Sequence, residues 1–434
     1  MPGIIYDQGM RRLSTGVLTA IGIILAFNPV YVLMTLVLGG YLPNAALIGL
    51  KYLPFVLLVA GLAVAAVWRW RVVGRPGWRD APHEIQVAVA LLGWCMLNIA
   101  WSSASVWQSM RGLNVDFAGV LLFVTIWLLR PKLVWEGRLR WVMLATLGGL
   151  LVLAIPESLW NQAFRLWSRH DLAIHYVVQT IPQLRSLTSG PNPFGTLMVL
   201  LAGILALLVA GRRSKPAWLL PALMVPVGLC LGLTYARSAW IGGAVGIGGY
   251  FVYRLWHDKR FVVWPVVLGL AILAGASFGA TRYHEGVWNV LTHGKSTEEH
   301  AQIAKEAADE AYRQTLASTL FGHGLGTAGP VVFGTKAGAS GDVGSQVAES
   351  WYIQLFQEIG IIGLALYCWL YVAMTRRLFR FHLFVGWLAV GLAFNAITLH
   401  TWSADVNVNV MFWTLAALTL YASGRGRPAT PELP

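Results

Sequence analysis

Residues 217–234 read AWLLPALMVPVGLCLGLT and contain no charged side chain. A helix of ~20 residues crosses the ~30 Å hydrocarbon core of a bilayer, and this run approaches that length. Similar uncharged runs cover residues 15–38 and 261–279. The chain of 434 residues is 57% hydrophobic and only 12% charged, a composition that would leave a soluble globule covered with exposed apolar surface. The sequence therefore predicts an all-α polytopic membrane protein.

Uncharged runs recur along the whole chain and predict about 12 transmembrane helices. Their approximate ranges are residues 15–38, 45–68, 85–101, 115–129, 139–156, 193–211, 217–234, 239–253, 261–280, 351–374, 383–400 and 408–422. Every second connection carries a cluster of Lys and Arg, which marks the cytoplasmic side of an inner-membrane protein. We therefore expect both termini to be cytoplasmic, and the first apolar run, too long for a cleavable signal sequence, to remain as a span.

The opposite, periplasmic side then holds two long segments within a single integral membrane domain of residues 1–434. They are a first segment, residues 157–192, and a main loop between the ninth and tenth spans, residues 281–350. Ser296 and Glu299 have the spacing of a capping box, which predicts short helices in the main loop. The glycine-rich stretch from Gly324 to Gly344 is expected to be mobile, as a lid or an acceptor-binding loop.

Among the arginines on the predicted periplasmic side, away from the cytoplasmic clusters, three stand out: Arg185, Arg237 and Arg313. Arg165 and Arg169 have weaker claims. A planar guanidinium offers paired donors to phosphate oxygens, so convergent arginines can hold a pyrophosphate and stabilise it as a leaving group. The alternative is that each is an interfacial anchor that extends its charge toward the headgroups. Arg237 is the strongest candidate because its turn between two spans is so short.

Glu349 lies where the main loop enters the tenth span. At helical spacing it shares a face with Tyr352 and Phe356. A carboxylate near a helix N-terminus is favoured by the helix dipole, so one hypothesis is that Glu349 caps the helix. The other reading is a general base that takes a proton from an acceptor hydroxyl.

Several other function classes lack support. The net charge of +13 is scattered between apolar runs, which does not predict nucleic-acid binding. No nucleotide-binding loop or dinucleotide fingerprint occurs, and neither the cysteines nor the periplasmic histidines have a known metal-ligand spacing, so we expect no cofactor and no metal. Charged residues inside spans are few, namely Lys51 and Asp116, which argues against an ion-coupled transporter.

Short motifs at these arginines resemble those of the O-antigen ligase and polymerase superfamily. Members often carry an Arg before a Pro-Asn pair, an Arg in a Ser-Arg-Gly/Ala-like turn, and an Arg upstream of a Gly-x-Gly-x-Gly stretch. The corresponding residues here are Arg185 with Pro191 and Asn192; Ala236 to Trp240; and Arg313 ahead of Gly322, Gly324 and Gly326.

The most specific similarity is to the ligase pattern His-Asn/Ser/Gln, nine residues, Gly, two residues, Gly. It aligns with Glu349 and Ser350, then residues 351–359, then Gly360 and Gly363. This chain departs from the pattern at its first position, where Glu349 replaces the proposed catalytic His of ligases. A carboxylate can also serve as a base, but the departure weakens the choice of ligase over polymerase.

The resemblance implies transfer of a polysaccharide from undecaprenyl pyrophosphate to a sugar hydroxyl of lipid A-core, inverting and without metal or ATP. It implies pyrophosphate binding by Arg185, Arg237 and Arg313, and acceptor activation by Glu349. The residues expected to make further substrate contacts are Asn192, His323, Ser350 and Tyr352. The alternatives are an O-antigen or exopolysaccharide polymerase with the same donor, and a protein O-oligosaccharyltransferase. A flippase or exporter of lipid-linked glycans is the alternative from a different class, and it predicts more polar residues along the spans.

Overall fold

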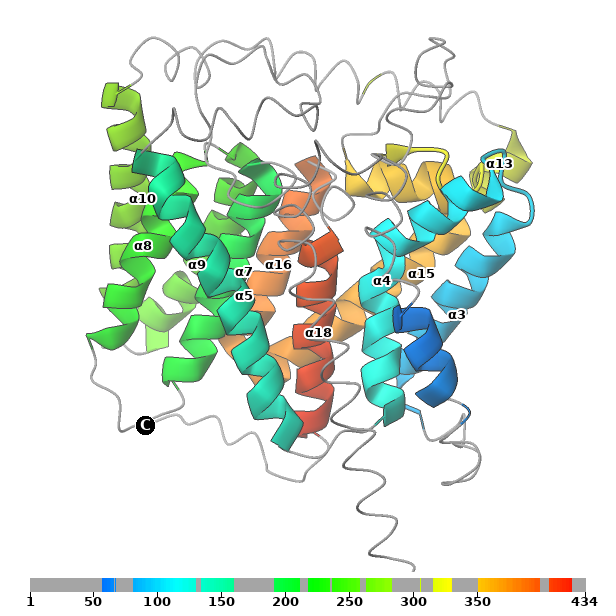
Figure 1. Ribbon diagram of the computed structural model, residues 1–434, viewed down its shortest axis with the longest axis horizontal. Coiled ribbons are helices and arrows are strands. Elements are labelled where there is room, and N and C mark those ends of the chain that lie inside the picture. The colour runs from blue at the N-terminus through cyan, green and yellow to red at the C-terminus, as the bar shows by residue number, and fades with distance from the viewer. Residues whose placement is uncertain are drawn as a thin grey trace, which may run out of the picture.

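The described part of the protein is all-helical (Figure 1). A computed structural model describes residues 57–65, 67, 81–129, 134–159, 191–210, 218–234, 236–257, 263–282, 305, 315–329, 350–398 and 406–423. No strand occurs within these ranges. The predicted all-α class is therefore confirmed for this part of the chain.

Every span predicted from residue 85 onward has a helix in the structure. The helices are α3 (His83–Ile99), α4 (Val106–Leu129), α5 (Val134–Leu159), α7 (Pro191–Ala210), α8 (Leu219–Leu233), α9 (Arg237–His257), α10 (Val263–Arg282), α13 (Leu316–Phe321), α15 (Trp351–Phe381), α16 (Leu383–Thr398) and α18 (Val406–Ser423). Residues 15–38, the first predicted span, lie outside the described residues. Helix α7 begins at Pro191 because the proline ring fixes a helical φ and an N–H is not needed at the first helical position.

The helices are apolar inside and outside the bundle. Two of those described, Val106–Leu128 in α4 and Trp351–Arg380 in α15, are long and apolar enough to cross a membrane by length and composition. Large apolar side chains also face outward, among them Trp256, Leu270 and Leu273. This pattern is expected of helices surrounded by lipid, where outward apolar side chains carry no penalty. The number of spans stays a prediction.

Glycines lie where pairs of helices approach each other most closely. Between α9 and α16, a Cβ on Gly242 would lie 2.8 Å from the carbonyl oxygen of Gly391, and one on Gly246 would lie 3.0 Å from that of Trp387. Between α8 and α10, a Cβ on Gly228 would lie 2.8 Å from the carbonyl oxygen of Leu268. Small residues allow backbones to approach in this way, which matters most where lipid removes the hydrophobic drive for association.

Replacing Gly242 with Leu is expected to separate α9 from α16 and lower the Tm of the purified protein. An overpacked interface costs about 1–3 kcal/mol. The matched control is Gly248→Leu on the same helix, because a Cβ at Gly248 meets nothing within 4 Å. Thermal unfolding in detergent, followed by tryptophan fluorescence, measures both. Equal Tm values for the two variants would contradict this account of the interface.

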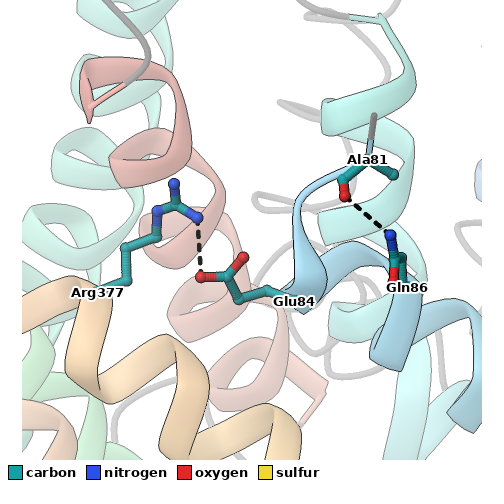
Figure 2. Close-up of polar contacts among 4 residues, drawn as sticks. All are labelled: Ala81, Glu84, Gln86 and Arg377. Atoms are coloured by element: carbon teal, nitrogen blue, oxygen red, sulfur yellow. Dashed lines mark hydrogen bonds and ion pairs between the residues drawn. The ribbon is translucent and has the colours of Figure 1, made fainter. Parts of the chain in front are cut away.

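Helices α3 and α15 run antiparallel and are joined at both ends. At one end, Arg377 in the last part of α15 forms an ion pair with Glu84 in the first turn of α3, with Nη1 and Oε1 2.8 Å apart (Figure 2). Beside it, the side chain of Gln86 donates to the carbonyl oxygen of Ala81, at 3.1 Å (Figure 2). At the other end, the Trp94 indole donates to the carbonyl oxygen of Ile359, at 2.9 Å. The ion pair lies at the end predicted to be cytoplasmic.

Helix α15 is bent at Gly360, whose φ of 67° and ψ of −176° are not helical. The bend divides it into a first segment, residues 351–359, and a long second segment, residues 361–381. In Figure 1 the first segment lies across the upper side of the bundle and the second descends through it. Residues 351–359 of the ligase-like pattern therefore form a short helical segment with its own direction.

Candidate functional site

Arg237 begins α9 directly after a structured turn. Helix α8 ends at Leu233, and the Thr234 hydroxyl both donates to the carbonyl oxygen of Leu231, at 2.7 Å, and accepts from the backbone N–H of Ala236, at 3.2 Å. The Trp240 indole donates to the same Leu231 carbonyl, at 2.8 Å. Arg237 itself is half-buried. The predicted short connection between the two helices is present, but Arg237 is the first residue of α9 and does not lie within the turn, because the helix begins two residues earlier than predicted.

The start of α7 packs against this turn. A Cβ on Gly195 would lie 2.8 Å from the Ala239 Cβ and 3.3 Å from the Thr234 hydroxyl. Asn192, less than one turn before Gly195, is half-buried, and its carbonyl oxygen accepts from the Thr196 hydroxyl, at 2.9 Å. The Pro-Asn segment and the arginine turn, expected from sequence to serve one substrate, therefore lie side by side.

The start of α15 is connected to these two segments through α16. Ser350 is the N-cap residue of α15, and the Tyr352 hydroxyl donates to the carbonyl oxygen of Ala393 on α16, at 3.4 Å. Two residues later, the buried Asn395 side chain donates to the Thr196 hydroxyl on α7, at 3.0 Å. Four predicted site residues thus lie at one end of a group of contacting helices: Asn192, Arg237, Ser350 and Tyr352.

A glycine turn, residues 322–329, lies against the first segment of α15. The backbone N–H groups of His323 and Gly324 donate to the carbonyl oxygens of Gln357 and Glu358, at 2.8 and 2.9 Å. The approach is so close that a Cβ on Gly322, where φ is +77°, would lie 2.6 Å from the Gly360 nitrogen. The His323 side chain is exposed, and its Nδ1 lies 3.3 Å from the Gln357 carbonyl oxygen.

The other side of the glycine turn is held by α3, α4 and their connection. The Asn98 amide donates to the carbonyl oxygen of Phe321, at 2.8 Å. The Ser102 hydroxyl donates to the carbonyl oxygen of Leu325, at 3.1 Å. The Gln108 amide donates to the carbonyl oxygen of Gly326, at 2.7 Å. The prediction that this stretch is mobile is therefore wrong for residues 324–329, because hydrogen bonds hold these residues on two sides. Residues 330–344 of that stretch lie outside the described residues.

Two carboxyl groups lie beneath the glycine turn. Asp116 on α4 and Glu358 on α15 are both fully buried. Glu358 Oε1 accepts from the backbone N–H of Ala328, at 3.1 Å, and Asp116 Oδ1 accepts from the Gln354 amide, at 3.3 Å. The Asn409 amide on α18 donates to the backbone carbonyl of Asp116. Glu358 therefore also lies inside a predicted span, although it was not among the charged span residues identified from the sequence.

Three predicted site residues lie outside the described residues: Arg185, Arg313 and Glu349. Their proposed roles stay predictions. Within the described ranges, no three His, Cys, Asp or Glu side chains come together as a metal-binding group.

The structure adds one basic candidate that sequence reasoning missed. Arg111 was assigned to a connection because the fourth span was predicted to start at residue 115. Helix α4 instead begins at Val106, so Arg111 lies in its second turn, next to the glycine turn: a Cβ on Gly112 would lie 2.8 Å from the Gly326 nitrogen. Arg111 could have been found from the sequence, because it lies on the side opposite the cytoplasmic clusters of Lys and Arg. The same feature identified Arg237.

One family model matches the chain. Residues 222–368 are similar to the family described as O-antigen ligase. The matched range contains the Arg237 turn, the glycine turn and the first segment of α15, together with Arg313 and Glu349. No curated protein matched the chain significantly.

Proposed function

We propose that this chain, which its residues 222–368 place in the O-antigen ligase superfamily, is an O-antigen ligase of the bacterial inner membrane. The resemblance seen in the sequence is confirmed at the level of the superfamily. Such proteins are membrane-integral and act on glycans, with a lipid-linked glycan donor and a glycan acceptor. The reaction we propose transfers a polysaccharide from undecaprenyl pyrophosphate to a sugar hydroxyl of lipid A-core, on the periplasmic side.

The observation that carries this proposal is the position of the matched range. It includes one candidate pyrophosphate ligand on a fixed turn, Arg237, and the ligase-like pattern that starts at Glu349. Contacts through α16 connect the Arg237 turn to the start of α15, two residues from Glu349 in sequence. The Arg237 turn and the start of α15 therefore lie at the same end of the bundle, which supports the proposal.

In the proposed reaction the arginines act on the leaving group. As the bond between the anomeric carbon and the pyrophosphate oxygen breaks, the oxygen keeps the electron pair and negative charge develops on the phosphates. Arg185, Arg237 and Arg313 are proposed to neutralise that charge with paired N–H donors. Because the donor is already activated, no ATP is required, and the guanidinium groups take the place that a metal ion has in other phosphate sites.

Glu349 is proposed to act on the acceptor. Its carboxylate takes the proton of the acceptor hydroxyl, and the oxygen attacks the anomeric carbon from the side opposite the pyrophosphate. One carbon–oxygen bond forms as the other breaks, so the anomeric configuration inverts. Asn192, His323, Ser350 and Tyr352 are proposed to contact the substrates.

A polymerase is the second candidate, because Glu349 stands where ligases have His. The test uses protein purified in lipid nanodiscs with undecaprenyl-pyrophosphate glycan, lipid A-core and a chelator, and without nucleotide. Growth of lipid A-core by the mass of the donor glycan supports the ligase. If only the lipid-linked glycan becomes longer, the protein is a polymerase. No transfer to either acceptor under these conditions overturns both proposals.

Replacing Arg237 with Ala is expected to slow transfer by about 10²–10³-fold, the usual loss when one donor to a developing charge is removed. Arg237→Lys keeps the charge without the paired N–H geometry and should recover only part of the rate. The matched control is Arg377→Lys at the opposite end of the bundle, which should leave the rate unchanged. Wild-type transfer by Arg237→Ala would show that Arg237 is an interfacial anchor.

A further inference from the structure

Asp116 and Glu358 form a buried carboxyl pair between α4 and α15. Both side chains are 0% exposed, and they are near neighbours, because Asp116 accepts from Gln354, one turn before Glu358 on α15, and the two carboxyl groups interact electrostatically. Each has one oxygen with a donor: Gln354 for Asp116 Oδ1 and Ala328 for Glu358 Oε1. The second oxygens, Asp116 Oδ2 and Glu358 Oε2, receive no hydrogen bond from the described part of the chain.

A single proton accounts for this arrangement. Two ionised carboxylates in contact repel each other, and burial away from water makes that repulsion costly. With one proton between them, one carboxyl group donates a hydrogen bond to the other and the repulsion between two charges is removed. Within the described residues, the other titratable side chains that interact with Asp116 are the Cys95 thiol on α3 and the Tyr367 phenol on α15, and neither can supply a positive charge.

The pair joins three parts of the candidate site. Glu358 belongs to the first segment of α15 and holds the glycine turn through the Ala328 N–H, while its own carbonyl oxygen accepts from the Gly324 N–H at 2.9 Å. Asp116 belongs to α4, and through Gln354 it holds the same segment one turn earlier. A Cβ on Gly329 would meet the Gln354 side chain. The end of the first segment is therefore fixed to α4 and to the glycine turn.

We propose that Asp116 and Glu358 share one proton and that this pair is a positioning element for the transfer reaction. The first segment of α15 carries Tyr352 near its start, and Glu349 directly precedes it. Fixing the far end of this short segment fixes the direction of its start, where Ser350 and Tyr352 lie. The positioning role rests on the proposed function, but the shared proton does not.

Infrared spectroscopy of the protein in nanodiscs tests the shared proton without any substrate. At neutral pH the wild type should show the carbonyl band of a buried, protonated carboxylic acid, with a shift in D2O. Glu358→Gln should remove the band, because an amide N–H then donates to Asp116 and no carboxyl proton is needed. A wild-type spectrum without this band, or a band that persists in Glu358→Gln and Asp116→Asn alike, overturns the proposal.

Transfer kinetics test the positioning role. Glu358→Gln and Asp116→Asn keep the contact between the two side chains and should transfer at close to the wild-type rate. Glu358→Ala should lower kcat by about 10²-fold, the usual cost of misplacing a reacting group by ~1 Å, with little change in donor Kd. The Tm of Glu358→Ala shows whether the protein is still folded. If kcat falls only to the extent that folded protein is lost, the pair contributes to packing alone, and the positioning role is overturned. If the wild type shows the band but no transfer, the proposed function fails and the shared proton stands.

Discussion

Glu349→Gln is expected to lower the rate of transfer by about 10²–10⁴-fold while donor binding stays close to wild type. General-base catalysis contributes a factor of this size, and the amide keeps the shape of the side chain but cannot take the acceptor proton. Since only a transition-state interaction is removed, the loss should appear in kcat and not in the Kd for the donor. Single-turnover transfer and a separate donor-binding assay measure the two quantities.

The matched control for this substitution is Glu84→Gln. Glu84 is a carboxylate at the opposite end of the bundle, where it pairs with Arg377 at 2.8 Å, so its loss should leave the transfer rate unchanged. Full activity in Glu349→Gln would assign Glu349 to the helix N-terminus and require another base. The N-cap position of α15 is occupied by Ser350, so a purely helix-stabilising Glu349 would act through the helix dipole.

Gly360→Ala is expected to have the largest effect among substitutions in the described residues. At φ 67° and ψ −176° the backbone lies in a region that is essentially restricted to glycine, at a cost of about 1–3 kcal/mol for other residues. The new Cβ would also lie 2.6 Å from the Gly322 nitrogen. Because the glycine turn and the first segment of α15 meet there, we expect a lower Tm together with loss of transfer.

Gly93→Ala provides the control for this prediction. Gly93 lies on α3, which packs against α15, but a Cβ there meets nothing within 4 Å, and its helical backbone accepts Ala readily. Its Tm should equal or exceed that of the wild type. Wild-type Tm and transfer in Gly360→Ala would show that the bend does not depend on glycine and that the first segment can be placed in another way.

The helices could be predicted from sequence where the information is local. An uncharged run of ~20 residues identifies a span without knowledge of its neighbours, which is why each range from residue 85 onward has a helix. The prediction failed at the start of α4, where Gln108 and Arg111 interrupt the apolar run. The polar side chain of Gln108 has a structural role, since its amide donates a hydrogen bond to the carbonyl oxygen of Gly326, at 2.7 Å. That contact joins residues far apart in sequence, so no local pattern reports it.

The candidate site was predicted only in part, for the same reason. The connection before Arg237 is short and local, and its presence between two helices was predicted, although α9 begins at Arg237 and not at residue 239. The glycine-rich stretch was read as mobile because glycine is flexible in isolation, whereas its close packing on Gly360 and on the α3–α4 connection depends on tertiary contacts. The pairing of Asp116 with Glu358 joins two helices distant in sequence, and Glu358 looked unexceptional inside an apolar segment.

The glycine turn also fixes the two ends of the chain that connects it to α15. Residues 330–349 leave after Gly329 and return at Ser350, and a Cβ on Gly329 would touch the side chain of Gln354, one turn into α15. Since the two ends are held close together, a doubling of the intervening length changes the closure free energy by only about 0.6 kcal/mol. A change in the length of this segment should therefore leave the helical bundle folded, with a Tm close to that of the wild type.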